Sequence, residues 1–253
     1  MIELQDVRLS FGERTLISDA TTRFERGTMV ALLGRNGTGK STLLRAIASL
    51  GGVQGGEIRI AGKPLAELSS QELARHIAFV NTERISVEGL TAHDLVAIGR
   101  SPYTDWMGRL TATDEEIISR SLHLAGIAEM ANKRVDRMSD GEAQRVMIAR
   151  ALAQATPIIL LDEPTAFLDM PHRYELCSLL SRLAHDEGKC IIFSTHELDI
   201  ALSLADSIAL VDTPKLHHLP TAEMITSGNI ERLFDSRYVT FDASTRSIRL
   251  NRG

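Results

Sequence analysis

Cysteine is scarce in this sequence of 253 residues, and positive charge is not in excess. The two cysteines, Cys177 and Cys190, have no metal-ligand spacing and form no disulfide framework, so we expect two buried thiols in a reducing compartment. The formal net charge of -5 argues against a protein that binds the phosphate backbone of a nucleic acid, which usually has a clustered basic excess. The sequence therefore excludes a disulfide-stapled scaffold and predicts no nucleic-acid partner.

Long hydrophobic runs are also absent. The longest apolar stretches, such as residues 157–161 and 190–193, are far shorter than the roughly 20 residues that cross a bilayer as a helix. The first ten residues carry acidic side chains and lack the basic-then-apolar pattern of a signal peptide. We expect a soluble protein that reaches a membrane only through a partner.

Short apolar segments predict the strands of the fold. Alternating apolar and polar residues in the first 30 positions indicate antiparallel strands, and residues 56–60 resemble another strand. Buried strands at 29–33, 157–162, 189–194 and 207–211 alternate with helical segments, including helices near 41–50, 171–187 and 197–205. This alternation predicts a mainly parallel sheet with helices on both faces.

Helical periodicity without strand signals extends from about residue 87 to about residue 155. Three sequences resemble capping boxes that begin helices, namely Ser69-x-x-Glu72, Thr91-x-x-Asp94 and Thr113-x-x-Glu116. The tail at 213–253 is polar, with strand-like pieces at 238–241 and 247–250, and we expect His217 and His218 in a solvated loop. We interpret residues 1–253 as one domain with a helical subdomain at about 87–155 and a C-terminal tail at about 213–253.

The strongest motif lies at residues 34–41, which fit the pattern G-x-x-x-x-G-K-[ST] in full between a predicted strand and a predicted helix. Its glycines allow backbone N–H groups to surround phosphates. We expect Lys40 to reach the β- and γ-phosphates of ATP, and Ser41 to ligate Mg²⁺. The other predicted nucleotide contacts in this segment are Gly34, Asn36, Gly37, Thr38, Gly39 and Thr42. A chance glycine-rich turn is disfavoured by the flanking strand and helix.

Two adjacent acids follow the apolar strand at 158–161. Asp162 is predicted to hold hydrated Mg²⁺ beside the phosphate loop, and Glu163 to orient and deprotonate the attacking water. The alternative is that both acids belong to a helix N-cap region. A phosphate loop without a water-activating acid would only bind nucleotide, so Glu163 favours an ATPase over a regulator without turnover. The predicted fold class is α/β, a P-loop NTPase core with a mainly parallel sheet, an N-terminal antiparallel β subdomain and a helical insertion.

Four further segments resemble a known family. Residues 138–145 resemble the LSGGQ signature of ATP-binding-cassette (ABC) proteins, and Ser139 stands 23 residues (162 − 139) before Asp162. Residues 164–169 are similar to the segment that ends in the D-loop aspartate, here Asp169. His196 follows a buried strand, as the switch histidine does in the family, which implies contact with the γ-phosphate. Phe11 follows the first strand, where the adenine-stacking aromatic is expected.

The resemblance implies a head-to-tail homodimer in which Ser139 and Gly141 of each subunit close the nucleotide site of the other. It also implies integral-membrane permease subunits, an extracytoplasmic substrate-binding protein as an indirect partner, and a peripheral location on the cytoplasmic face of the cell (inner) membrane. Two signature positions depart from the family pattern. Glu142 replaces the usual Gln, which we expect to be tolerated, and Asp140 replaces the usual Gly, an unfavourable neighbour for a phosphate.

A third departure follows the predicted strand at 77–80. The family normally has a glutamine there that contacts Mg²⁺ and the lytic water, whereas this sequence has Asn81, Thr82 and Glu83. Thr82 occupies the aligned position, and either Thr82 or Glu83 is a candidate replacement.

Residues 89–103 resemble the ATPase subunits that power uptake of iron–siderophore, haem and cobalamin. In that group a similar segment precedes an aromatic cluster, here Tyr103, Trp106 and Met107. These side chains either form a surface for a coupling helix of the permease or pack the helical insertion, and both interpretations stay open. The alternative function is a soluble ABC-type ATPase of iron–sulfur cluster assembly, against which the importer-like segment argues.

Overall fold

An antiparallel sheet forms the N-terminal part of the computed structural model, which describes residues 1–81 and 88–251. Its strand order is β2-β1-β4-β5. Ile2, Leu4, Val7 and Leu9 are buried, with an irregularity between Leu4 and Val7 that shifts the alternation by one residue. The pairing of this strand confirms the predicted antiparallel pattern. The strands are β1 (Ile2–Phe11), β2 (Arg14–Phe24), β4 (Gly55–Ile60) and β5 (Lys63–Pro64).

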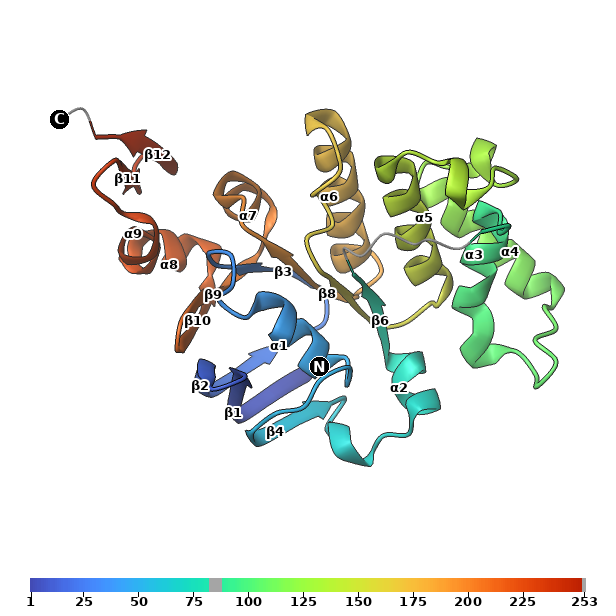
Figure 1. The fold of residues 1–253 in the computed structure, drawn as a ribbon, viewed down its shortest axis with the longest axis horizontal. Helices are drawn as coiled ribbons and strands as arrows, with labels where there is room; N and C mark the ends of the chain where they lie inside the picture. The colour runs from blue at the N-terminus through green and yellow to red at the C-terminus, as the bar shows by residue number, and fades with distance from the viewer. Residues whose placement is uncertain (82–87, 252–253) are drawn as a thin grey trace.

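A second, mainly parallel sheet forms the centre of the molecule (Figure 1). In the described part of the chain its order is β10-β9-β3-β8-β7-β6, and only the β10–β9 pair is antiparallel. Every residue of β7 and β8 is buried, as expected for central strands covered on both faces. The strands are β3 (Thr28–Leu33), β6 (Ile77–Val80), β7 (Ile158–Leu161), β8 (Cys190–Thr195), β9 (Ser207–Asp212) and β10 (Lys215–Pro220).

Two apolar cores lie on opposite faces of this sheet. Val30 and Leu32 of β3 pack with α1 (Lys40–Ile47) and with the N-terminal sheet, so this helix is held between the two sheets. Met29 and Leu33 contribute to the other core. That core includes apolar residues of α5 (Asp140–Ala153), α6 (Met170–His185) and α7 (Leu198–Leu204). The observed layers confirm the predicted α/β class.

Described residues 88–155 contain helices and no strand, as predicted, and these helices gather at one end of the molecule (Figure 1). Capping boxes begin α2 (Ser70–His76) at Ser69 and α3 (Ala92–Ala97) at Thr91, both as expected. The box predicted at Thr113 and Glu116 is wrong. The helix α4 (Ala112–Leu124) begins two residues earlier, with Thr111 and Asp114 forming its box. The carboxylate of Asp114 also pairs with buried Arg100, which favours the earlier start.

The tail is more ordered than the sequence indicated. It forms β10, α8 (Thr221–Thr226), α9 (Asn229–Phe234), β11 (Val239–Asp242) and β12 (Ser247–Leu250). The prediction of a solvated loop at His217 and His218 is wrong, because both lie in β10. The two ring nitrogens of His218 bond the hydroxyls of Thr22 (2.8 Å) and Ser207 (2.9 Å), and burial lowers the pKa of its imidazole. The four central residues of this strand, two leucines and two histidines, are all half-buried, so no alternation of apolar and polar residues marks it in the sequence.

The two thiols are buried, as predicted, and burial raises the pKa of Cys177 to about 11 and that of Cys190 to about 12. None of the helices in residues 1–81 and 88–251 is both long and apolar enough to span a bilayer.

Candidate nucleotide-binding site

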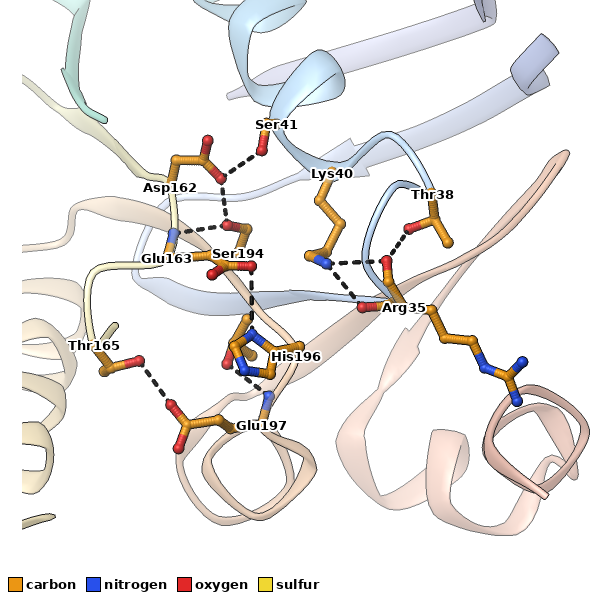
Figure 2. Close-up of polar contacts among 12 residues, drawn as sticks. Arg35, Thr38, Lys40, Ser41, Asp162, Glu163, Thr165, Ser194, His196 and Glu197 are labelled. Carbon is orange, nitrogen blue, oxygen red and sulfur yellow. Dashed lines mark hydrogen bonds and ion pairs between the residues drawn. The ribbon is translucent and has the colours of Figure 1, made fainter. Parts of the chain in front are cut away.

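The carboxyl ends of three neighbouring parallel strands bring the predicted site residues together. The β3, β8 and β7 strands are adjacent, and they are followed by Gly34, His196 and Asp162, respectively. Because the carboxyl ends of parallel strands meet at one edge of a sheet, their loops form a shared concave region there. Residues far apart in the sequence thus lie together (Figure 2).

The loop between β3 and α1 wraps around the Lys40 side chain. The Nζ atom donates to the carbonyl oxygens of Gly34 (2.8 Å) and Arg35 (3.2 Å), and the Thr38 hydroxyl donates to the same Arg35 oxygen (Figure 2). Gly39, with φ at 104°, precedes the helix, and a Cβ there would meet Leu16 at 3.0 Å. Burial lowers the pKa of Lys40, while the charges of Glu163 and Asp162 oppose this shift. The two carbonyl oxygens thus hold the Lys40 ammonium group in place, and Lys40 also lines a pocket that a ligand could enter.

Asp162 connects the phosphate loop to the strand beside it. Its Oδ1 accepts hydrogen bonds from the hydroxyls of Ser41 (2.9 Å) and Ser194 (2.6 Å). A hydroxyl and a buried carboxylate at this separation are the oxygen ligands that Mg²⁺ prefers alongside water and phosphate, so the donor set fits this cation. Among residues 1–81 and 88–251 no group of three His, Cys, Asp or Glu side chains could hold a metal by itself. Phosphate and water oxygens would have to complete the coordination.

Glu163 occupies an unusual backbone position, with φ at 43° in the left-handed region. Its N–H donates to the Ser194 hydroxyl (2.8 Å), and its Oε1 lies 3.4 Å from Nδ1 of His196. The Ser194 hydroxyl therefore positions both acids, since it accepts from the backbone N–H of Glu163 and donates to the carboxylate of Asp162. Ser194 lies two residues before His196, and no role was predicted for it from the sequence because its two partners are 31 and 32 residues away.

A pocket of about 580 Å³ contains most of the predicted nucleotide contacts. Phe11 lines this pocket and is 78% exposed, so its ring is accessible for stacking on a bound adenine. Gly34 and Thr38 take part through the hydrogen bonds of the loop rather than by lining the pocket. The lining residues among the predicted ones are Phe11, Asn36, Gly37, Gly39, Lys40, Ser41, Thr42 and Glu163.

Besides Gly34 and Thr38, three further predicted contacts do not line this pocket. Ser139, Gly141 and Asp169 line a second pocket of about 740 Å³, and no residue lines both. Ser139 caps α5 and Asp169 caps α6, so both side chains lie at helix N-termini, where partial positive charge is favourable for anions. A Cβ at Gly141 would lie 3.3 Å from the Phe167 carbonyl oxygen, so this glycine allows close contact with the 164–169 segment. These two separate pockets are the candidate half-sites of a nucleotide site.

An ion pair with Lys133 balances the charge of Glu142, one of the two acids that depart from the family's signature pattern. Lys133 Nζ lies 2.7 and 2.9 Å from the two Glu142 oxygens, and Glu142 Oε2 also accepts from the Ser139 N–H (2.8 Å). These hydrogen bonds lower the pKa of Glu142. No sequence pattern pairs Lys133 with Glu142, since Lys133 lies in the loop before α5 and Glu142 in the first turn of that helix. Lys133 thus balances the negative charge that Glu142 introduces in place of the family's Gln, which supports the expectation that this departure is tolerated.

In the importer-like segment at 89–103, packing and charge explain why Gly99 and Arg100 occupy their positions. A Cβ at Gly99 would meet the Arg150 carbonyl oxygen at 2.4 Å, and Arg100 pairs with Asp114 while 5% exposed. The Tyr103 ring lies 4.2 Å from the Arg100 guanidinium carbon, so Tyr103 packs locally. Trp106, by contrast, is 92% exposed and does not pack the helical region. The candidate residues Thr82 and Glu83 lie outside the described residues.

Comparison with known proteins gives a consistent result. A family model described as ABC transporter matches residues 17–166. The chain is 39% identical over 216 residues to the uncharacterized ABC transporter ATP-binding protein MJ0873 of Methanocaldococcus jannaschii, covering 85% of this chain and 74% of that protein. It is 35% identical to the probable siderophore transport system ATP-binding protein YusV of Bacillus subtilis, covering 92% and 85%, respectively.

Solved structures with this fold include an ATP-binding cassette, MJ0796, in two dimeric forms. One is described as a bacterial ABC transporter cassette and has a TM-score of 0.78 with 27% identity. The other is a post-hydrolysis state bound to ADP and Pi, with a TM-score of 0.77 and 27% identity. Each similarity covers 87% of this chain and 99% of the other.

Proposed function

Because this chain belongs to the ABC transporter family, we propose that it powers uptake of an iron–siderophore, haem or cobalamin-type substrate through a separate permease. The chain is an ATPase of the ABC transporter family, as the family model and its similarity to a cassette bound to ADP and Pi show. Relatives named for import support the importer type. Relatives whose names include siderophore, iron(3+)-hydroxamate, ferric enterobactin and cobalamin transport support this substrate class. No similarity above favours the alternative in iron–sulfur cluster assembly.

In the proposed mechanism ATP occupies the pocket between Phe11 and Lys40. Lys40 and His196 contact the γ-phosphate, and Glu163 accepts a proton from water as the water oxygen bonds phosphorus and the bond to the β-phosphate oxygen breaks. Mg²⁺, held through Ser41 and Asp162, would supply positive charge to the phosphate oxygens. The contact between Glu163 and His196 supports these roles, because it places the proton acceptor beside a group that can bond phosphate.

The separation of the two half-sites is the observation that carries the proposed dimer. Lys40 and Ser139 line different pockets, so one subunit cannot enclose ATP with both. Two subunits in head-to-tail arrangement would place Ser139, Gly141 and Asp169 of each against the ATP of the other. ATP then stabilises the dimer, and hydrolysis releases it. The dimeric form of the similar cassette MJ0796 supports this arrangement.

A cleft of about 670 Å³ is the proposed permease contact. It is bordered by residues of α1, α2, β6 and the end of α5, including Leu50, Phe79 and Gln154. Trp106 and Met107 are also exposed on the chain, at 92% and 53%, and large exposed side chains of this kind are enriched at interfaces. The subunit would then act peripherally at the cytoplasmic face of the membrane. An extracytoplasmic binding protein would be an indirect partner.

The decisive experiment uses Glu163→Gln, which keeps the size of the side chain and removes the proton acceptor. We expect this variant to bind ATP, to lose at least about 100-fold in turnover, and to form an ATP-dependent dimer in light scattering. The double variant Glu163→Gln/Ser139→Ala should dimerise less, and Glu187→Gln, which changes an ion pair with Arg120, serves as a matched control with normal turnover. Normal turnover by Glu163→Gln would contradict its role as base. Failure of ATP to dimerise this variant, even with the permease present, would contradict the composite site.

A further inference from the structure

Glu197, the residue after His196, contacts the segment that connects the two half-sites. Its Oε1 accepts a hydrogen bond from the Thr165 hydroxyl (3.1 Å; Figure 2), and its Oε2 forms an ion pair with Arg173 Nη1. Its own N–H donates to Thr195 Oγ1 (3.0 Å). The carboxylate therefore has two partners from a distant part of the sequence, and its backbone is fixed at the end of β8.

Arg173 extends this contact to the far end of the segment. Its Nε donates to the Leu168 carbonyl oxygen (2.7 Å) while its Nη1 pairs with Glu197. Thr165 and Leu168 are 3% and 5% exposed, and the Glu197 side chain is 19% exposed. The Arg173 side chain is 33% exposed, so solvent screens its pair with Glu197 in part, though less than it screens a fully exposed ion pair. One carboxylate thus joins both ends of residues 165–168 to the loop of His196.

The ends of the connected segment belong to different half-sites. Glu163, which precedes it, lies 3.4 Å from His196 and lines the first pocket. Asp169, which follows it, lines the second pocket together with Ser139. Contacts made by Glu197 therefore link the His196 loop both to Thr165 and to the Arg173–Leu168 contact. The contacts provide a direct path between the two half-sites of one chain.

We propose that Glu197 is a positioning residue that makes the His196 loop and the 164–169 segment move as one unit. This inference rests on the proposed function, since it assumes that the Asp169 half-site faces the ATP of a second subunit. Contact between His196 and a γ-phosphate would then adjust Asp169 in the other composite site. Glu197 does not touch the reacting atoms. Its loss should slow hydrolysis without weakening ATP binding.

The test compares Glu197→Gln, Thr165→Val and the control Glu187→Gln in the full-length chain. We expect the first two to lower kcat at least about tenfold, because small misplacements of catalytic groups have effects of this size. Their affinity for a fluorescent non-hydrolysable ATP analogue should stay within about twofold of the wild type. Arg173→Lys, which keeps the charge, should retain more activity than Arg173→Met. Thermal unfolding verifies that each variant is folded, and Thr165→Val, which keeps both charges, suffices if Glu197→Gln does not fold.

A double variant tests the path itself. If Glu197 acts through the 164–169 segment, Glu197→Gln should have little further effect on kcat once Asp169→Ala is present. Unchanged kcat in Glu197→Gln and Thr165→Val, an equal loss of ATP affinity and kcat, or additive effects with Asp169→Ala would overturn the inference. Absence of hydrolysis by the wild-type chain would instead overturn the proposed function.

Discussion

Phe11 illustrates what a single residue contributes when its partner is a ligand. It is 78% exposed at the rim of the nucleotide pocket, so folding gains little from it. We predict that Phe11→Ala weakens ATP binding by about 1 kcal/mol through lost stacking, roughly a fivefold increase in Kd. Thermal stability should stay nearly constant. A titration with ATP measures the effect, and an unaltered Kd would reject Phe11 as the adenine-contacting residue.

Other single residues show why only part of the site could be predicted. Lys40, Ser41, Asp162 and Glu163 belong to short local motifs whose chemistry can be read from residue type and spacing. The roles of Lys133 and Ser194 depend on partners brought close by folding, and no local pattern encodes such pairs.

Among the elements, the start of α4 depends on a buried charge that the sequence did not identify. Hydrogen bonds from the Thr111 backbone and hydroxyl, together with those from Arg100, lower the pKa of Asp114 to about 2. Thr111 and Thr113 each precede a suitable acid by three residues, so both registers satisfy the capping pattern. The ion pair between Arg100 and Asp114 favours the start at Thr111 over the start at Thr113. Short elements of the tail were missed for a related reason, since α8 and α9 have only six residues each.

We predict that Asp114→Asn destabilises the fold by about 3 kcal/mol, because it leaves Arg100 buried without a counter-charge. The folded pKa of Asp114 is depressed, so its stabilisation is present above about pH 4 and is lost as the pH falls through about 2. Chemical denaturation at several pH values measures the difference between variant and wild type. Asp19→Asn, in an exposed ion pair with Arg8, is the control and should change stability little. An equal effect of both substitutions would contradict the buried-pair argument.

For the molecule as a whole, the alternation of strands and helices predicted the α/β class and the parallel sheet, because burial on both faces requires continuous apolar strands. The link between the two sheets was not predictable from periodicity. His218 of β10 bonds Thr22 of β2, and its ring lies 4.9 Å from that of Phe24. A polar residue that is half-buried in a strand resembles a loop residue in sequence.

This link predicts a pH dependence of global stability. Burial lowers the folded pKa of His218 below its unfolded value, so its contribution is complete above the unfolded pKa and is lost as the pH falls through the folded one. We expect the free energy of unfolding to decrease between about pH 7 and about pH 5, and His218→Gln to reduce this decrease. His123→Gln, at an exposed position, provides the comparison. A pH dependence identical in the wild type and His218→Gln would contradict the assignment.

The sole tryptophan of the chain is Trp106, and solvent surrounds nearly all of it. Indole emission shifts to shorter wavelength when water is removed from the ring, so Trp106 is an intrinsic fluorescent probe among the exposed side chains that we propose for the permease contact. Association could therefore be followed with unmodified protein, and a label at this position reports occupancy of that surface separately from events at the nucleotide.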